Sequence, residues 1–334
     1  MYRLSCCNKR YLGTCVTLYF GSPDRSAVYL EQQVGVVENL GSPMDTGTAL
    51  CSVVTHSVLQ EFLLLKSSFE LFHGKSHRWF VRCDQPSAEV LREYPNIVST
   101  VFTEAIQERP DIESRAFREL ASQKTNALSD AWAAGAWQSV LFLDADLTIT
   151  ATVLSAISLV EGSVLLTPNF YPPSREHLSS IHGVYNSGFV VTRTRAFHDW
   201  WREGIIAHPE KWTDQGVLND AARYFEIGTL PETANVGFWR SESAFQPLPI
   251  PAKCMFLHVH FFQPLISNRQ WIDRAFAVHC LEFLRYSPVP EHHVIFNTIM
   301  AQDLAGWYRA TMQIRVNDKG ASVGGGPGRG SRLE

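Results

Sequence analysis

Two aspartates separated by one residue, Asp144 and Asp146, are the residues of this chain whose type and spacing best suit chemistry. They follow the apolar run Ser139–Leu143, which predicts a buried strand covered on both faces. Ligands of open α/β sheets bind beyond the carboxyl ends of the strands. Carboxylates there can bind Mg²⁺ or Mn²⁺, and these cations often also take phosphate oxygens as ligands. The pattern therefore predicts a metal site for a phosphate group, with a simple polar turn as the alternative.

Two histidines provide further candidate ligands. His258 and His260 lie in the apolar, strand-like run Met255–Phe262, where alternation would place both imidazoles on one face. One buried histidine is usually a satisfied core residue, whereas two on one face favour a metal or phosphate contact. We predict that this pair contacts a metal or a phosphate, and the alternative of two core histidines stays open.

Other polar positions suit a bound phosphate or sugar. Lys124 lies on the apolar stripe of a predicted helix, where it would pair with Asp144, reach a diphosphate or extend to solvent. The segment Asn186–Gly188 offers amide groups and a glycine that permits close approach. Asp214 and Gln215 begin a further predicted helix, where the aspartate has the alternative role of a helix cap.

Strand and helix patterns alternate around these positions. The predicted strands are Ala49–Val54, Trp79–Cys83, Ser139–Leu143, Val164–Leu166 and Phe189–Val191, and the predicted helices are Glu61–Phe72, 115–135 and Arg269–Tyr286. The first strand, helix and strand form a βαβ unit, which favours a parallel sheet. We therefore predict an α/β protein with a single main domain.

Composition limits the class of protein. The chain has 334 residues, is 45% hydrophobic and carries a formal charge of −4, which suits one large globular domain and gives no sign of a nucleic-acid partner. We predict an irregular N-terminal segment over 1–47, the main domain over 48–316 and a disordered Gly-rich tail over 317–334. The oligomeric state is left open.

Cysteine usage and hydropathy bear on the compartment. The 7 cysteines are odd in number and form no C-x-x-C pair, so neither a disulfide framework nor a zinc site is implied. The sequence contains no run of about 18 apolar residues, so no membrane span is predicted. The first 20 residues make a poor signal peptide. These features predict a cytoplasmic protein.

Taken together, the ordered motifs resemble the nucleotide-diphospho-sugar transferase superfamily, notably its plant-type retaining and glycogenin-like branches. The motifs are Val54-Thr55, Lys124, Asp144-Ala145-Asp146, Asn186-Ser187-Gly188, Asp214-Gln215 and His258-Val259-His260. One departure is that Phe261-Phe262-Gln263-Pro264 follows the last motif, where the glycogenin-like branch has a glycine and a lysine.

The resemblance implies a GT-A-type, Rossmann-like mixed sheet, mainly parallel and flanked by helices. It also implies a metal-dependent, retaining glycosyltransferase that moves a sugar from a nucleotide-diphosphate donor, expected to be a UDP-sugar, to a hydroxyl of a glycan, protein or small molecule. The donor-binding residues would be Val54, Thr55, Lys124, Asp144, Ala145, Asp146, Asn186, Ser187 and Gly188. Mn²⁺ or Mg²⁺ would bind Asp144, Asp146, His258 and His260, and Asp214 and Gln215 would be catalytic.

Two other functions fit parts of the pattern. Residues 144–148 also match the D-x-D-x-T signature of haloacid-dehalogenase-type phosphatases, in which Asp144 would be the nucleophile. Those proteins usually carry this motif on their first strand and add a late acidic pair, which is not evident in this sequence. A non-catalytic sugar-nucleotide-binding protein is the third interpretation.

Overall fold

The computed structural model describes residues 4–5, 17–18, 47–102, 115–208, 214–242, 249–262 and 270–301. The chain divides into two compact units, Met1–Asp45 and Thr46–Glu334. In the first unit, strands β1 (Leu4–Ser5) and β2 (Thr17–Leu18) pair antiparallel. Most of the predicted segment 1–47 and all of the predicted tail 317–334 lie outside the described residues, so the domain boundaries remain predictions.

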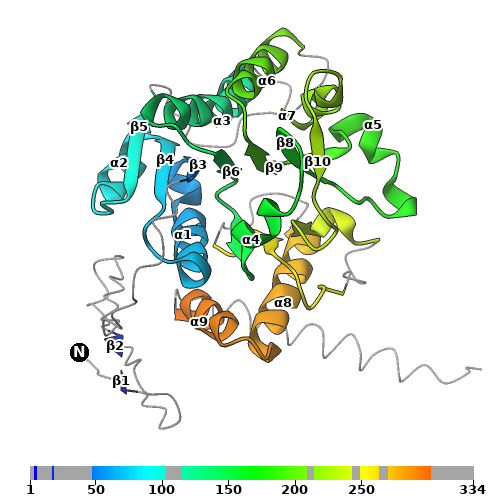
Figure 1. The fold of residues 1–334 in the computed structure, drawn as a ribbon. Helices are drawn as coiled ribbons and strands as arrows, with labels where there is room; N and C mark the ends of the chain where they lie inside the picture. Colours follow the sequence, from blue (N-terminus) through cyan, green and yellow to red (C-terminus); the bar gives the residue numbers. More distant parts are fainter. Residues whose placement is uncertain are drawn as a thin grey trace, which may run out of the picture. The chain divides into compact units, whose positions relative to one another are not determined.

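A 7-stranded sheet forms the centre of the second unit, in the order β10-β8-β9-β6-β3-β4-β5 (Figure 1). Its strands are β3 (Thr48–Val54), β4 (Arg78–Cys83), β5 (Ile97–Val101), β6 (Ser139–Leu143), β8 (Val164–Pro168), β9 (Tyr185–Thr192) and β10 (Ile227–Thr229). Every neighbouring pair is parallel except the two pairs that β9 makes with β6 and β8. The predicted mixed, mainly parallel sheet is therefore confirmed.

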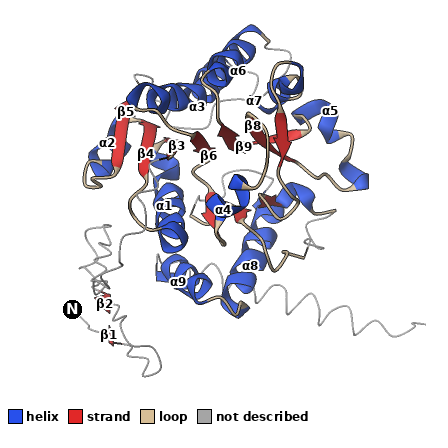
Figure 2. Ribbon diagram, in the orientation of Figure 1, coloured by secondary structure: helices blue, strands red, loops and turns tan. Residues whose placement is uncertain are grey.

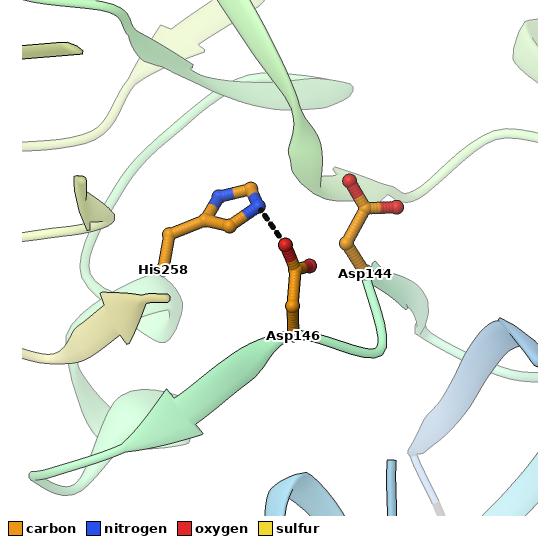
Figure 3. Close-up of side chains that lie close together, drawn as sticks. All are labelled: Asp144, Asp146 and His258. Carbon is orange, nitrogen blue, oxygen red and sulfur yellow. Dashed lines mark ion pairs between the residues drawn. The ribbon is translucent and has the colours of Figure 1, made fainter. Parts of the chain in front are cut away.

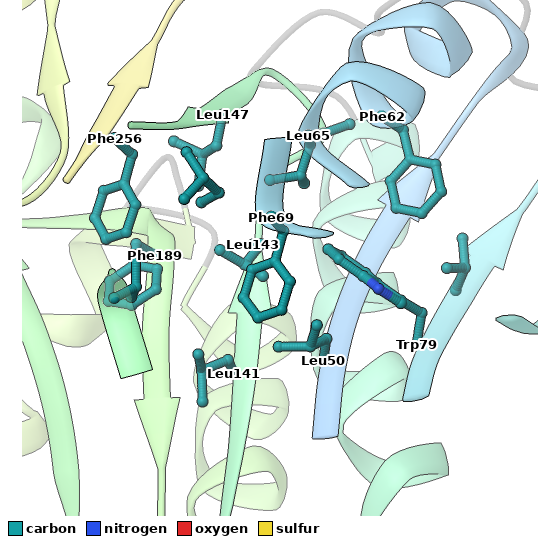
Figure 4. Packing of buried hydrophobic residues seen from close by; sticks show 14 of the residues in the cluster. Leu50, Phe62, Leu65, Phe69, Trp79, Leu141, Leu143, Leu147, Phe189 and Phe256 are labelled. Carbon is teal, nitrogen blue, oxygen red and sulfur yellow. The ribbon is translucent and has the colours of Figure 1, made fainter. Parts of the chain in front are cut away.

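Helices cover both faces of this sheet, which is why its central strands are continuously apolar. On β6, Leu141 and Leu143 pack into one core cluster, whereas Val140 and Phe142 pack into the other. The first cluster, drawn in Figure 4, includes residues of α1 (Leu59–His73), α2 (Gln85–Leu91) and α4 (Val153–Ser158). The second includes residues of α3 (Arg115–Ala134), α6 (Ala196–Ala207) and α7 (Asp214–Leu218).

A second, 3-stranded sheet lies at the carboxyl end of β6, where the chain turns into β7 (Leu147–Ile149). Strand β12 (Phe256–His258) pairs antiparallel with β7 and parallel with β11 (Val236–Gly237). Two closing helices, α8 (Gln270–Tyr286) and α9 (Pro290–Ile299), share a third core cluster with residues of β11 and β12. Figure 2 shows the two helices beside each other at the bottom of the second unit. This small sheet brings the late histidines to the end of β6.

The remaining short elements lie in the connections. They are helix α5 (Leu178–His182) and the 3₁₀ turns His56–Val58, Pro173–Arg175, Ala221–Arg223 and Phe238–Arg240.

The structure confirms the predicted strands and helices and adds elements that the sequence patterns did not predict, among them β5, α6 and α9. One predicted strand was too long: of the strand-like run Met255–Phe262, only Phe256–His258 forms a strand. The strand thus ends at the first histidine of the pair, and His260 follows it. Among the described residues, no helix is long and apolar enough to cross a membrane.

Candidate metal and donor site

The two aspartates lie on a tight turn between β6 and β7. The Asp144 backbone N–H donates to the Gly188 carbonyl at 2.8 Å, and the Leu147 N–H donates to the Asp144 carbonyl at 3.2 Å. Ala145, between the two aspartates, packs its side chain into the core, so only its backbone can face a ligand. The turn therefore anchors both carboxylates at the carboxyl end of a buried strand, as the sequence predicts.

Strand β12 places His258 beside this turn. His258 stands opposite Leu147 in the β7–β12 register, and its Nε2 lies 3.1 Å from Asp146 Oδ2 (Figure 3). His260 reaches the same oxygen, with its Nε2 at 3.2 Å, although it lies beyond the strand. Potential ligand atoms of Asp144, Asp146 and His258 all lie within 4.8 Å of one another. Two carboxylates and an imidazole at this spacing suit a divalent cation such as Mn²⁺.

The pKa values of the two aspartates shift in opposite directions. Burial by itself would raise the pKa of Asp146, but the imidazoles of His258 and His260 hold that pKa well below its usual range. Burial raises the pKa of Asp144, and the nearby Lys124 offsets this effect only in part. The two imidazoles therefore stabilise the ionised form of Asp146, beside the second carboxylate.

Lys124 lies on α3 and contacts residues of three other segments of the site. Its Nζ lies 2.9 Å from Asp144 Oδ1 and 2.7 Å from Asp214 Oδ2, and it donates to Ser187 Oγ at 3.2 Å. Burial by itself would lower the pKa of Lys124, but the two carboxylates outweigh it and raise that pKa above its usual value. The ammonium group is thus held charged between β6, β9 and α7.

The segment 186–188 lies at the start of β9, against the aspartate turn. Asn186 is 6% exposed, and its Oδ1 accepts from the Gly188 N–H at 2.8 Å. The Ser187 N–H donates to Gln215 Oε1 at 3.3 Å, which links this segment to α7. Asp214, the first residue of α7, is buried, whereas Gln215 is only partly buried. Of the two predicted catalytic residues, Gln215 is the more accessible to a substrate.

Val54 and Thr55 lie at the same edge of the sheet, because β3 and β6 are parallel neighbours. Val54 is buried in the core, whereas Thr55 is partly exposed and its Oγ1 lies 2.9 Å from Ser57 Oγ. Asp84 holds this loop, since its Oδ2 accepts from the His56 N–H at 2.7 Å. Only the backbone of Val54 can contact a ligand here, whereas Thr55 can also use its side chain.

Sequence patterns missed two asparagines and a tryptophan that support the site. Asn235 Oδ1 lies 3.0 Å from His258 Nδ1, and Asn169 Oδ1 accepts from Asn186 Nδ2 at 3.2 Å. The Trp239 ring meets the His258 ring edge-on, with centroids 5.0 Å apart. Single residues in loops carry no periodic signal, so only the structure connects them with the metal cluster.

Comparisons with known proteins give matches among solved structures. No protein-family model matches the chain, and no curated protein is significantly similar to it. The WbbM bifunctional glycosyltransferase is similar at 12% identity and a TM-score of 0.45, over 78% of this chain and 53% of that one. The galactosyltransferase LgtC, solved with donor and acceptor sugar analogs, is similar at 10% identity and a TM-score of 0.47, over 76% of this chain and 95% of that one.

Both of these proteins are glycosyltransferases. This chain spans only about half the length of WbbM. Both TM-scores are below 0.5, so only the residues of the site bear on the substrate and mechanism of this chain.

Proposed function

We propose that this protein is a metal-dependent glycosyltransferase that moves a sugar from a nucleotide-diphosphate donor, a UDP-sugar, to a hydroxyl of a glycan, a protein or a small molecule. The observation that carries the proposal is the cluster of Asp144, Asp146 and His258 at the carboxyl end of β6. Carboxylates repel a diphosphate unless a cation lies between them. Open α/β sheets bind their ligands at this edge.

Asp144, Asp146 and His258 would hold Mn²⁺ or Mg²⁺. His260, whose Nε2 lies 3.2 Å from Asp146 Oδ2, would be a further candidate ligand. The cation would neutralise the charge that develops on the departing diphosphate. Gly188 supports this assignment, because a Cβ at position 188 would lie 2.5 Å from His258 Cε1 and 2.8 Å from Asp144 Oδ2. The glycine lets these two ligands come together.

Residues of the chain itself would position the rest of the donor. The partly exposed Thr55 and the backbone of Val54 would contact the base. Lys124 would keep Asp144 and Asp214 ionised, and it lies close enough to Asp144 to add positive charge beside a phosphate. Ser187 would present its hydroxyl to the donor from β9, next to the lysine.

We further propose retention of the anomeric configuration. An inverting enzyme needs a free carboxylate base beside the acceptor hydroxyl. Asp214 is poorly suited to that role, because it is buried and its Oδ2 lies 2.7 Å from Lys124 Nζ. Gln215 is partly exposed and follows Asp214 directly, so its amide would stabilise positive charge at the anomeric carbon. The anomeric proton of the product, followed by NMR against that of the donor, tests this assignment, and an inverted product would refute it.

The phosphatase interpretation is not favoured. Strands β3, β4 and β5 precede the aspartate turn, whereas the phosphatase motif usually lies on the first strand.

A nucleotide-release assay with a panel of UDP-, GDP- and ADP-sugars tests the proposal. We expect release in Mn²⁺ or Mg²⁺ but not in EDTA, and a loss on the order of a thousandfold in Asp146→Ala, as for a lost electrostatic contact in the transition state. Asp199→Asn is the matched control, since Asp199 is 58% exposed and lies on α6. Release that persists in chelator, or hydrolysis of a generic phosphate ester without release from any donor, would overturn the proposal.

A further inference from the structure

Three buried asparagines form a hydrogen-bonded chain that ends on His258. Asn169 follows β8, Asn186 lies at the start of β9 and Asn235 immediately precedes β11. Their exposed fractions are 1%, 6% and 0%. Buried amides must satisfy both their donor and their acceptor groups, so the direction of each amide in this chain is determined by its neighbours.

The protein backbone sets that direction at two separate points. The Gly188 N–H can only donate, so the Asn186 atom that lies 2.8 Å from it is the carbonyl Oδ1. The Gly183 carbonyl can only accept, so the Asn169 atom that lies 2.9 Å from it is Nδ2. The two assignments agree, because they leave Asn186 Nδ2 to donate to Asn169 Oδ1 at 3.2 Å.

Asn235 connects this chain of amides to the histidine. Asn235 faces Asn186 Oδ1 at 2.7 Å and must therefore present its donor, Nδ2. Asn235 Oδ1 then faces His258 Nδ1 at 3.0 Å. Because an amide oxygen only accepts, Nδ1 carries a proton, which leaves Nε2 as the nitrogen that can give up its proton and bind a cation. That nitrogen lies 3.1 Å from Asp146 Oδ2, on the side of the metal cluster.

We propose that Asn235 is a positioning residue that sets the tautomer of His258, so that the unprotonated Nε2 faces the cation. This inference rests on the proposed function. Asn235 has a φ of 60°, and the only other non-glycine residue with positive φ in the described part of the chain is Phe170, next to Asn169. Such strained backbone clusters at ligand sites. Asparagine tolerates it better than most residues, while its side chain supplies the acceptor.

Trp239 also restrains the His258 ring, through a direct aromatic contact. Its indole N–H donates to the Asn169 carbonyl at 2.9 Å, and its ring packs edge-on against His258 at an interplanar angle of 89°. Asn169 therefore connects the asparagine chain to the aromatic contact, and both restrain the same imidazole. Partners of this kind tune metal affinity by holding the ligand ring in one orientation and one tautomer.

Two substitutions at position 235 test the inference as a matched pair. Asn235→Asp and Asn235→Gly both tolerate a positive φ, and both lose the amide donor to Asn186. Only aspartate keeps an acceptor opposite His258 Nδ1. Long-range ¹H–¹⁵N NMR of the histidine rings, recorded at pH 9 with saturating Mg²⁺, reports the tautomer directly. The His258→Asn variant, in which Asn235 is unchanged, identifies the signals of His258. The Mn²⁺ dissociation constant, measured by electron paramagnetic resonance, is the second readout.

We expect the Nδ1–H tautomer in the wild type and in Asn235→Asp, and its loss in Asn235→Gly with Mn²⁺ binding weakened by about 10- to 100-fold. An Nε2–H tautomer in the wild type, or the wild-type tautomer in Asn235→Gly, would overturn the inference. Mn²⁺ binding by Asp146→Asn separates the two proposals. If that variant loses Mn²⁺ while Asn235→Gly behaves as the wild type, only this inference fails. If Asp146→Asn binds Mn²⁺ normally, the proposed function itself fails.

Discussion

Gly188 matters at the residue scale because it has no side chain. A Cβ there would lie 2.5 Å from His258 Cε1, 2.8 Å from Asp144 Oδ2 and 2.9 Å from Asn186 Oδ1. None of these neighbours can move freely, because Lys124 holds Asp144 and the asparagine chain holds the other two. An added methyl group would therefore separate the metal ligands.

Gly188→Ala should accordingly weaken Mn²⁺ binding by about tenfold or more, as for a displaced ligand sphere. Titration of the purified protein with Mn²⁺ measures the effect. Gly47→Ala is the matched control, because the added Cβ meets only the end of the Gln138 side chain, at 2.8 Å. Equal Mn²⁺ affinity in Gly188→Ala and the wild type would show that His258 and Asp144 do not form one site.

Lys124 compensates two carboxylates at once, so its removal should affect stability as well as activity. Lys124→Met leaves Asp144 and Asp214 facing each other in a largely buried place. Removing one partner of a buried ion pair costs about 3–5 kcal/mol. Urea denaturation should show a loss of this order in Lys124→Met and none in Lys75→Met, whose side chain is exposed. A Lys124→Met variant as stable as the wild type would contradict the bridging role of the ammonium group.

At the element scale, local patterns predicted the strands and helices that carry the charged residues. The run 139–143 is a strand whose buried residues alternate between two covered faces, and Lys124 lies on the apolar stripe of α3 because it pairs with Asp144. Strand direction could not be predicted, since an apolar run such as 189–191 has the same pattern in a parallel and an antiparallel strand. Asn235 had no sequence signal, because its role depends on a long-range contact with His258.

His292, on α9, connects the closing helices to the rest of the fold. Its Nε2 donates to the Thr150 carbonyl at 2.7 Å, and its Nδ1 accepts from Ser287 Oγ at 2.7 Å. The imidazole also packs against Phe283, with ring centroids 5.2 Å apart. Burial lowers the pKa of His292 from its usual value, so the folded protein keeps this ring neutral. His292 thereby ties α9 to the residue that follows β7.

The lowered pKa of His292 predicts that the folded protein loses stability in mild acid. Below about pH 6.5 the unfolded chain binds a proton at His292 that the folded chain does not, so the free energy of unfolding falls as the pH falls. His292→Gln should reduce this slope between pH 7 and 5, measured by urea denaturation at each pH. His177→Gln is the matched control, since that side chain is exposed and lies outside the closing helices. An unchanged slope in His292→Gln would contradict the assignment.

At the scale of the whole molecule, one edge of the main sheet gathers segments that are distant in sequence. The parallel strands β3 and β6 end side by side, so Thr55 follows β3 at the same edge as the aspartate turn. The antiparallel β9 begins at the same edge and contributes residues 186–188, and β12 adds His258 through its pairing with β7. A metal-bound diphosphate at this edge would contact all of these segments, so donor binding depends on the complete fold.

Calorimetric titration with UDP, the part common to all UDP-sugars, tests this account most directly, with GDP and ADP titrated in parallel. We expect UDP to bind in Mn²⁺ and its affinity to fall on the order of 100-fold in EDTA and in Asp146→Asn protein with Mn²⁺. Asp199→Asn should bind UDP as the wild type does. If no nucleoside diphosphate binds, or if binding is the same in chelator and in the Asp146→Asn variant, the cluster of Asp144, Asp146 and His258 is not the donor site.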